Sequence, residues 1–293
     1  MNKKIFSAEV EKLKITTLMD DKADSQKPYL AQHGISFFIE FTANGEDHTL
    51  LFDTGQEHEP ILYNTKALGV DLNNTEKIFL SHCHNDHTGG LVGLLKEIDK
   101  DIEILGHTDL FRDTYKKVDS LVYKGISEEN SKKNIEKNGG KLNLTKETFE
   151  IFPGALSTGQ IERNTGTKPT GYYNKIEEDK YEVDYFLDDM SVVFNLKEKG
   201  LFIVTGCSHA GIVEIVEHSV EITGNDKVYG IIGGLHLLNK DEVQINEIIG
   251  KLEKYDIEFI SAGHCTGLAA EYLLSKKYGE KFESLNAGKV FEV

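Results

Sequence analysis

The chain has little positive charge and no long apolar run. Its 33 lysines and arginines stand against 49 aspartates and glutamates, which gives a formal net charge of −16. Binding to a nucleic-acid backbone requires clustered basic residues, so this balance weighs against a nucleic-acid partner. No stretch approaches the roughly 18 apolar residues of a membrane-spanning helix, and the N-terminus lacks an apolar signal core. We therefore expect a cytoplasmic protein with no membrane partner.

Cysteine is also scarce. The chain has three cysteines, and Cys83, Cys207 and Cys265 each lie within two residues of a histidine. An odd number without regular spacing is unlike a disulfide framework and indicates a reducing compartment. Small buried thiols behave as apolar residues, so all three can be structural. Their position beside histidines leaves open the alternative that one of them binds a metal.

The densest polar motif is Ser81–Gly90, with the sequence SHCHNDHTGG. In an extended segment, side chains two residues apart point the same way, so His82 and His84 can reach one metal. Asp86 and His87 follow on a turn and can reach a second metal. Imidazole and carboxylate ligands suit zinc first, with iron or manganese as alternatives. A polar loop that is rich in histidine by chance is the less favoured interpretation.

Three later loops share one pattern, in which a buried-type strand is followed by glycine-flanked histidine or cysteine. They carry Cys207 with His209, then His236, then His264. Loops that follow strands are where α/β proteins place functional groups. We predict His209 and His264 as metal ligands, with Cys207 near the metal. His236 is either an acid, base or hydrogen-bonding group of the site or an ordinary loop residue.

Asp53 ends a strand at 48–52 and precedes Thr54-Gly55. It is either a turn aspartate or a carboxylate that orients a ligand histidine. We expect the remaining histidines to be structural or on the surface; these are His33, His48, His58, His107 and His218.

The order of predicted elements is strands, strand–helix alternation, strands again and alternation again. The residues 35–42 and 48–52 predict a hairpin around Asn44-Gly45, and 91–98 and 268–278 predict helices. We expect a helix at 109–116 and a loop at 163–179. The polar segment at about 117–147 is expected to be an excursion over the surface of one domain that spans 1–293.

A family resemblance covers nearly the whole chain. The hairpin ending in Asp53-Thr54-Gly55, the HxHxDH loop, TGCSHAG, GGLH and GHCTG occur in one order. That order closely resembles the metallo-β-lactamase-fold superfamily, in its branch of 7,8-dihydropterin-6-methyl-aminobenzene-phosphate synthase-like proteins. The resemblance implies an α/β fold, a four-layer αββα sandwich of two mixed sheets with outer helices. Layering rules permit this architecture without selecting it.

The resemblance also implies how the ligands divide. His82 and His84 would hold a first metal, Asp86 and His87 a second, and His264 would complete the second. The chain departs from the usual pattern in two ways: 157–163 contains no histidine, and Cys207 stands near the place of a bridging aspartate. We expect His209 to complete the first site. A diiron redox protein is disfavoured, because His84 stands where that branch has glutamate.

These observations together predict a metal-dependent hydrolase with one or two divalent ions. It would act on a small ester or phosphoester, phosphorylated or not, through a hydroxide produced at the metal. Asp86 would orient the nucleophile, and His236 would steady the leaving group. The alternatives are a dihydropterin-linked synthase or transferase and a non-catalytic metal or ligand sensor. The partner is expected to be a small molecule; a homodimer, the substrate and the metal's identity stay open.

Overall fold

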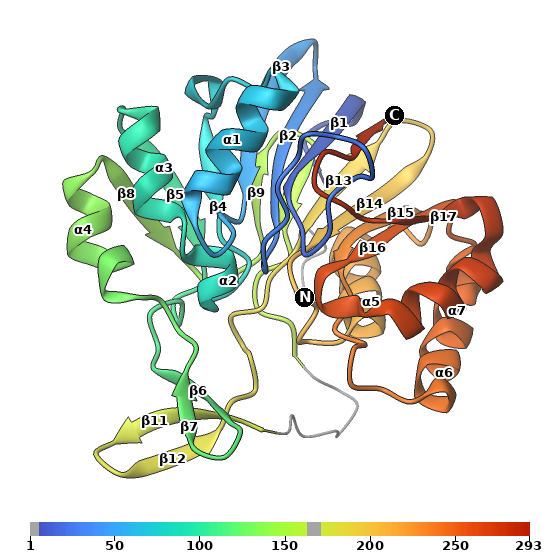
Figure 1. Cartoon of the computed structure of the whole chain (residues 1–293). Coiled ribbons are helices and arrows are strands. Elements are labelled where there is room, and N and C mark those ends of the chain that lie inside the picture. Colours follow the sequence, from blue (N-terminus) through green and yellow to red (C-terminus); the bar gives the residue numbers. More distant parts are fainter. Residues whose placement is uncertain (1–5, 163–170) are drawn as a thin grey trace.

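The computed structural model describes residues 6–162 and 171–293 (Figure 1). Its main strands form two mixed sheets that meet at one edge, where Val10 pairs with Leu196. The first sheet contains β1 (Val10–Met19), β2 (Ser36–Ala43), β3 (Glu46–Phe52), β4 (Lys77–Phe79), β5 (Ile102–Gly106), β8 (Gly140–Leu144) and β18 (Val290–Glu292). The second contains β9 (Phe149–Phe152), β10 (Ala155–Ser157), β13 (Val192–Leu196), β14 (Gly200–Thr205), β15 (Val228–Gly234), β16 (Phe259–Gly263) and β17 (Phe282–Ser284).

Helices cover the outer face of each sheet. On the first sheet lie α1 (His58–Leu68), α3 (Leu91–Ile98) and α4 (Lys132–Lys137); on the second lie α5 (Ile212–Thr223), α6 (Glu242–Leu252) and α7 (Leu268–Tyr278). The single-turn helix α2 (Asn85–Thr88) follows the carboxyl end of β4. Short 3₁₀ turns occur at Leu72–Asn74, Glu128–Asn130, Glu253–Tyr255, His264–Thr266 and Gly279–Lys281.

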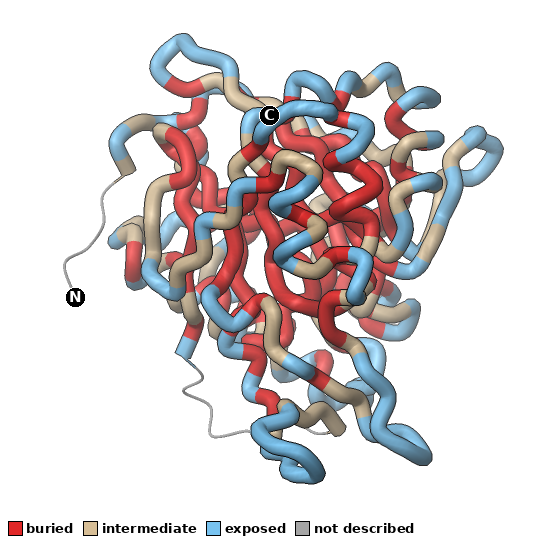
Figure 2. The backbone as a smooth tube through the Cα atoms, turned by 90° about the vertical axis from the view of Figure 1, so that its left-hand side faces the viewer, coloured by how far each residue is buried: buried red, intermediate tan, exposed pale blue. Residues whose placement is uncertain are grey.

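Three apolar clusters hold these layers together, and Figure 2 shows the buried residues concentrated in the middle of the molecule. The cluster between the sheets includes Phe37, Phe52 and Phe202. Two outer clusters pack each sheet against its helices, as Phe38 does on one side and Ile215 on the other. Because β2 is buried on both faces, its sequence is almost continuously apolar instead of alternating. The four-layer αββα sandwich predicted from the resemblance is therefore confirmed.

Within these layers, the predicted hairpin turn and two of the predicted helices are confirmed. Asn44 and Gly45 both have left-handed backbone conformations, with φ of 54° and 76°, as a tight two-residue hairpin turn requires. Helices α3 and α7 begin and end at the predicted residues. Among the described residues, no helix combines the length and apolar character needed to cross a bilayer.

The polar segments differ from the predictions. The helix expected at 109–116 is wrong, because Thr114–Lys117 forms strand β6. In the loop expected at 163–179, residues 163–170 lie outside the described residues and Tyr172–Glu177 forms β11. Strands β6 and β11 form a four-stranded sheet with β7 (Leu121–Tyr123) and β12 (Lys180–Val183). Its strand order is β12-β11-β6-β7, and we call it the accessory sheet.

The excursion predicted at 117–147 needs a further correction. Its last part, β8, pairs in parallel with β5 and forms the edge of the first sheet. Ile135 of α4 is fully buried, and Leu142 and Leu144 of β8 pack against the same cluster. An edge strand with one covered face needs few apolar residues, so its composition resembled that of a surface loop.

Candidate metal centre

The predicted ligands all follow the carboxyl ends of strands. His82 and His84 follow β4, while Cys207 and His209 follow β14 and His264 follows β16. Strand β4 is parallel to its neighbours in the first sheet, as β14, β15 and β16 are to one another in the second. The two parallel halves therefore present their loops along one rim of the sandwich. Residues far apart in the sequence meet there.

A first group consists of His82, His84 and His209. The Nε2 atom of His209 lies 3.2 Å from Nδ1 of His84. The ring centre of His82 lies 4.7 Å from that of His84 and 4.9 Å from that of His209. One ring nitrogen from each residue can converge on a common point. The group is the one predicted, with His209 as its third member.

The buried nitrogens of this group fit a metal ion. The Nε2 atoms of His82 and His84 are buried and have no hydrogen-bond partner among the described residues. Burial lowers the pKa of His84 to about 3 and holds the pKa values of His82 and His209 well below the usual range. All three imidazoles are therefore neutral near pH 7, which is the form that binds metals.

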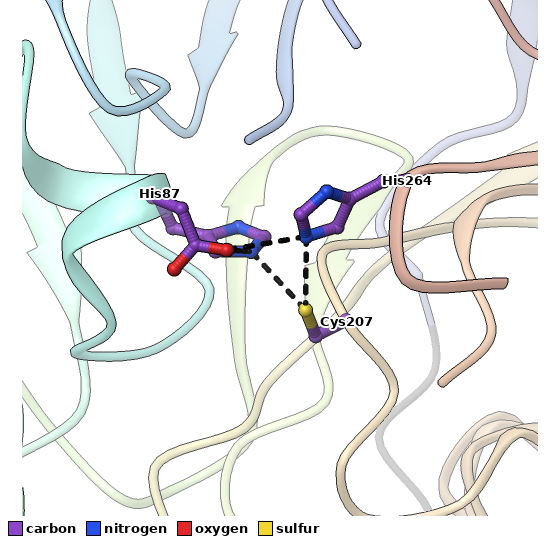
Figure 3. A group of neighbouring side chains, drawn as sticks. His87, Cys207 and His264 are labelled. Carbon is purple, nitrogen blue, oxygen red and sulfur yellow. Dashed lines mark hydrogen bonds and ion pairs between the residues drawn. The ribbon is translucent and has the colours of Figure 1, made fainter. Parts of the chain in front are cut away.

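A second group brings together Asp86, His87, Cys207 and His264 (Figure 3). The Sγ atom of Cys207 lies 3.2 Å from Nε2 of His87 and 3.3 Å from Nε2 of His264. Oδ2 of Asp86 lies 3.3 Å from the same nitrogen of His264. One carboxylate, two imidazoles and a thiol form a donor set suited to zinc or iron.

Asp86 is charged in this setting. Its burial raises the pKa, but the charge of His87 and the hydrogen bond with His264 outweigh that effect and hold the pKa well below its usual range. The carboxylate is thus available as a ligand. The structure also places Cys207 directly between two predicted ligands, which the sequence left open.

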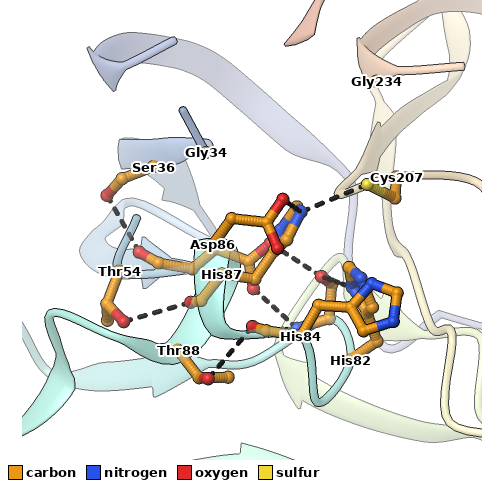
Figure 4. A network of polar contacts seen from close by, with 12 residues as sticks. Gly34, Ser36, Thr54, His82, His84, Asp86, His87, Thr88, Cys207 and Gly234 are labelled. Atoms are coloured by element: carbon orange, nitrogen blue, oxygen red, sulfur yellow. Dashed lines mark hydrogen bonds and ion pairs between the residues drawn. The ribbon is translucent and has the colours of Figure 1, made fainter. Parts of the chain in front are cut away.

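Asp53 connects the two histidine groups, of which Figure 4 shows His82, His84, Asp86, His87 and Cys207 close together. Its Oδ2 lies 2.6 Å from Nδ1 of His87 and accepts a hydrogen bond from Ser81 Oγ. The same hydroxyl lies 2.9 Å from Nδ1 of His82. Asp53 adopts a left-handed conformation with φ of 54°, an uncommon one for a residue other than glycine. These contacts are those expected of a carboxylate that orients ligand histidines.

His33 was predicted to be structural or on the surface; it is exposed, and it also lies beside the second group. Asp21 holds His33 Nδ1 at 2.9 Å and His264 Nδ1 at 2.7 Å. The other nitrogen of His33 lies 3.3 Å from Asp86 Oδ2. No signal in the sequence pointed to this pair, because His33 lies in a polar loop and Asp21, although it follows the buried strand β1, has no histidine or cysteine beside it.

His236 lies beside the first group. Its ring centre is 4.2 Å from that of His209, and its Nδ1 is buried without a hydrogen-bond partner among the described residues. With φ of 49°, its backbone is also left-handed. The position is compatible with the predicted acid or base role, which stays a prediction.

Two aromatic rings that the sequence did not single out cover the first group. Phe186 stacks on His209, with ring centres 4.1 Å apart and an interplanar angle of 5°. Tyr172, at the start of β11, stacks on His84 at 5.4 Å. Both residues come from the accessory sheet or the segment that leaves it. They make one wall of the site largely apolar, with the two rings packed edge to face at an interplanar angle of 71°.

A buried arginine fixes this wall to the ligand loops. Arg112 forms ion pairs with Asp184 and Asp188, and its guanidinium lies near the ring of Phe186. Asp188 also accepts a hydrogen bond from the backbone N–H of Cys83, at 2.8 Å. Cys83 itself is fully buried in the core of the first sheet. The network thus ties the accessory sheet to the backbone between His82 and His84.

Comparisons with known proteins agree on the family. A model of the metallo-β-lactamase superfamily matches residues 33–159. The 7,8-dihydropterin-6-methyl-4-(β-D-ribofuranosyl)-aminobenzene-5′-phosphate synthase of Methanocaldococcus jannaschii is 40% identical over 287 residues, which cover 97% of each chain. An uncharacterised protein of the same organism is 29% identical, covering 89% of this chain and 94% of its own.

Solved structures share the fold. Tm1679, described as a metal-dependent hydrolase of the β-lactamase superfamily, superposes with a TM-score of 0.80 at 23% identity, covering 96% of this chain and 99% of its own. The short form of human tRNase Z gives a TM-score of 0.50 at 14% identity, covering 95% and 98%. At these identities the likeness concerns the fold alone.

Proposed function

Because the chain belongs to the metallo-β-lactamase superfamily, we propose that it is a metal-dependent synthase acting on a dihydropterin. It would join the methyl carbon of the pterin to the amino group of an aminobenzene that carries a ribofuranosyl 5′-phosphate. The observation that carries this proposal is the 40% identity to a synthase of that product across 97% of both chains. Such coverage extends well beyond the segment matched by the superfamily model.

The proposed reaction exchanges one bond for another without an oxidant. The lone pair of the amine nitrogen forms a bond to the methylene carbon of the pterin. The bond from that carbon to its leaving group breaks, and the nitrogen loses one proton. We choose diphosphate as the leaving group for the test, because it departs as a stable anion.

The residues of the chain would divide this work. Divalent ions, zinc first among the candidates, would supply positive charge to the departing anion. His82, His84 and His209 would hold one ion, and the group of Asp86, His87, Cys207 and His264 another. His236 would accept the proton of the amine through its buried Nδ1, which no described residue contacts by a hydrogen bond.

The aromatic wall favours an aromatic substrate. Phe186 and Tyr172 lie directly against the ligands His209 and His84. Apolar rings beside a few polar groups are the usual lining of a small-molecule site, and they exclude water from it. A pterin and an aminobenzene are both planar rings that such a wall can accept.

Hydrolysis, the reaction predicted from the sequence, is the competing outcome. The same donor set suits it, but the hydrolases among the solved structures share only the fold. A sensor without turnover is the third outcome. Both can be separated from the synthase by one assay series.

The experiment incubates zinc-loaded protein with 6-(hydroxymethyl)-7,8-dihydropterin diphosphate and 4-(β-D-ribofuranosyl)aminobenzene 5′-phosphate. Product is detected by liquid chromatography and mass spectrometry, and reactions that lack one substrate serve as controls. We expect the coupled product only when both substrates are present. Hydrolysis of bis(p-nitrophenyl) phosphate without coupling would favour the hydrolase, and metal binding without either activity would favour the sensor.

A further inference from the structure

The accessory sheet has two chemically different faces. Tyr172 pairs with Lys116, and Asn174 pairs with Thr114, across β11 and β6. Directly opposed residues of antiparallel strands project from the same face. The backbone N–H of Lys124 donates to the carbonyl of Thr114, so Lys124 stands opposite Thr114 on the other side of β6. These five residues therefore share one face.

That face is turned toward the metal centre. The ring of Tyr172 stacks on His84, and Thr114 Oγ1 donates to the buried Asp184 at 2.6 Å. The backbone carbonyl of Lys124 accepts a hydrogen bond from the N–H of Asn85, at 3.0 Å. Since Asn85 immediately precedes Asp86, Lys124 is attached to the loop that carries the ligands.

The opposite face consists largely of tyrosines. Tyr115 contacts Tyr123 and Tyr181 through its ring, with centres 5.4 and 5.5 Å apart. Lys117 lies two residues from Tyr115 on the same strand, so it projects from this tyrosine face and is exposed. The strand β6 thus carries one lysine toward the site and the next lysine away from it.

Charge pairing separates the two site-facing lysines from the other cations nearby. Arg112 is neutralised by Asp184 and Asp188, and Lys22 is paired with Glu271 at 2.6 Å. Among the described residues, neither Lys116 nor Lys124 forms an ion pair. The Nζ of Lys116 instead lies 5.5 Å from the ring centre of Tyr172. In a chain with a net charge of −16, two unpaired cations facing one site create a local attraction for anions.

We propose that Lys116 and Lys124 bind the phosphate monoester of the substrate. The aromatic part of that substrate would then lie along Tyr172, with its reacting nitrogen toward the metal ligands. Lysine ammonium groups are common phosphate binders and donate hydrogen bonds strengthened by charge. The proposal rests on the proposed function for the identity of the phosphorylated substrate. It adds the accessory sheet as the element that selects the phosphorylated form.

The test compares Lys116→Ala and Lys124→Ala with Lys117→Ala, the matched control on the opposite face. KM is measured for 4-(β-D-ribofuranosyl)aminobenzene 5′-phosphate and for the same compound without its phosphate. We expect each site-facing variant to raise KM for the phosphorylated substrate about 10-fold, as loss of a charge-assisted hydrogen bond would. The KM for the dephosphorylated compound, the bound metal and the activity of Lys117→Ala should stay unchanged.

Equal KM values for the two compounds in the wild-type enzyme would overturn the proposal, as would equal behaviour of the three variants. A second probe separates this failure from failure of the proposed function. Binding of ribose 5-phosphate to the zinc-loaded protein is measured by calorimetry, which needs no turnover. Weaker binding in Lys116→Ala and Lys124→Ala alone would support the phosphate site even if no coupled product forms. Unchanged binding in both variants would reject it even if the enzyme is a synthase.

Discussion

The rim of the main sheets and the accessory sheet contribute to one site in different ways. At the rim, each ligand follows a buried strand and is held by short contacts within the same layer, such as that of Asp53 with His87. The accessory sheet supplies no predicted ligand, and it reaches the site through Tyr172, Phe186 and the Arg112 network. From this comparison we expect the rim to determine the chemistry and the accessory sheet to determine what can approach it.

The largest effect should come from the rim. Replacing His82 with Ala removes a predicted ligand whose Nε2 has no hydrogen-bond partner in the part of the chain that the structure describes, so we expect activity to fall to the uncatalysed rate and bound metal to decrease. Metal content by inductively coupled plasma mass spectrometry and turnover are measured together. His218→Ala, on α5 and in neither ligand group, is the control and should retain both. Full activity of His82→Ala would contradict the prediction that the first group holds a metal needed for the reaction.

Breaking the attachment of the accessory sheet should come next. Arg112→Ala leaves Asp184 and Asp188 buried without their cation, which typically costs about 3–5 kcal/mol in the free energy of unfolding. Urea denaturation measures this loss. Arg112→Lys keeps the charge but not the planar geometry, so its free energy of unfolding should lie between those of the wild-type protein and Arg112→Ala. A loss of less than about 1 kcal/mol would show that the two regions are held together by other contacts.

A smaller effect is expected from the contact that orients the ligands. Asp53→Asn keeps the shape of the side chain but removes the charge facing His87 and Ser81. We expect metal affinity to fall about 10- to 100-fold, the usual range for such partners. Competition with a zinc-binding dye measures the affinity. Asp47→Asn, an exposed change in the hairpin, is the control; equal affinities in the two variants would remove Asp53 from the site.

The smallest effect should come from the aromatic wall. Phe186→Leu removes a stacking contact with His209 worth about 0.5–1.5 kcal/mol, so we expect KM to rise by a few-fold. The metal content should not change, because the ligands stay in place. Tyr185→Leu, at the exposed neighbouring residue, is the control. Loss of metal in Phe186→Leu would contradict this expectation, because it would show that the aromatic wall also holds the metal ligands in place.

Much of this arrangement could be predicted from residues next to one another. The SHCHNDHTGG motif identified the loop of His82, and a buried strand followed by a glycine-flanked histidine identified those of His209 and His264, because each signal is contained in about ten residues. The hairpin at Asn44-Gly45 was predictable for the same reason. The site residues that escaped prediction, His33 and Tyr172, have no such neighbours in the sequence.

Three strands of the accessory sheet, β6, β7 and β11, were missed for a physical reason. The strands of this sheet are three to six residues long, and most of their side chains are half-buried or exposed. Such strands lack a strong apolar period and are stabilised by pairing across distant segments, as Tyr172 pairs with Lys116. Their existence depends on contacts that no local window contains.

The sequence by itself determined the kinds of donor, their order along the chain and the strands that carry them. Only the tertiary structure decided that Cys207 joins His87 and His264 while His209, two residues later, joins His82 and His84. It also decided that Arg112 and Tyr172 reach the ligands at all. The reason is that two sheets place their parallel strand ends along one rim, and the distances across that rim depend on how the layers pack.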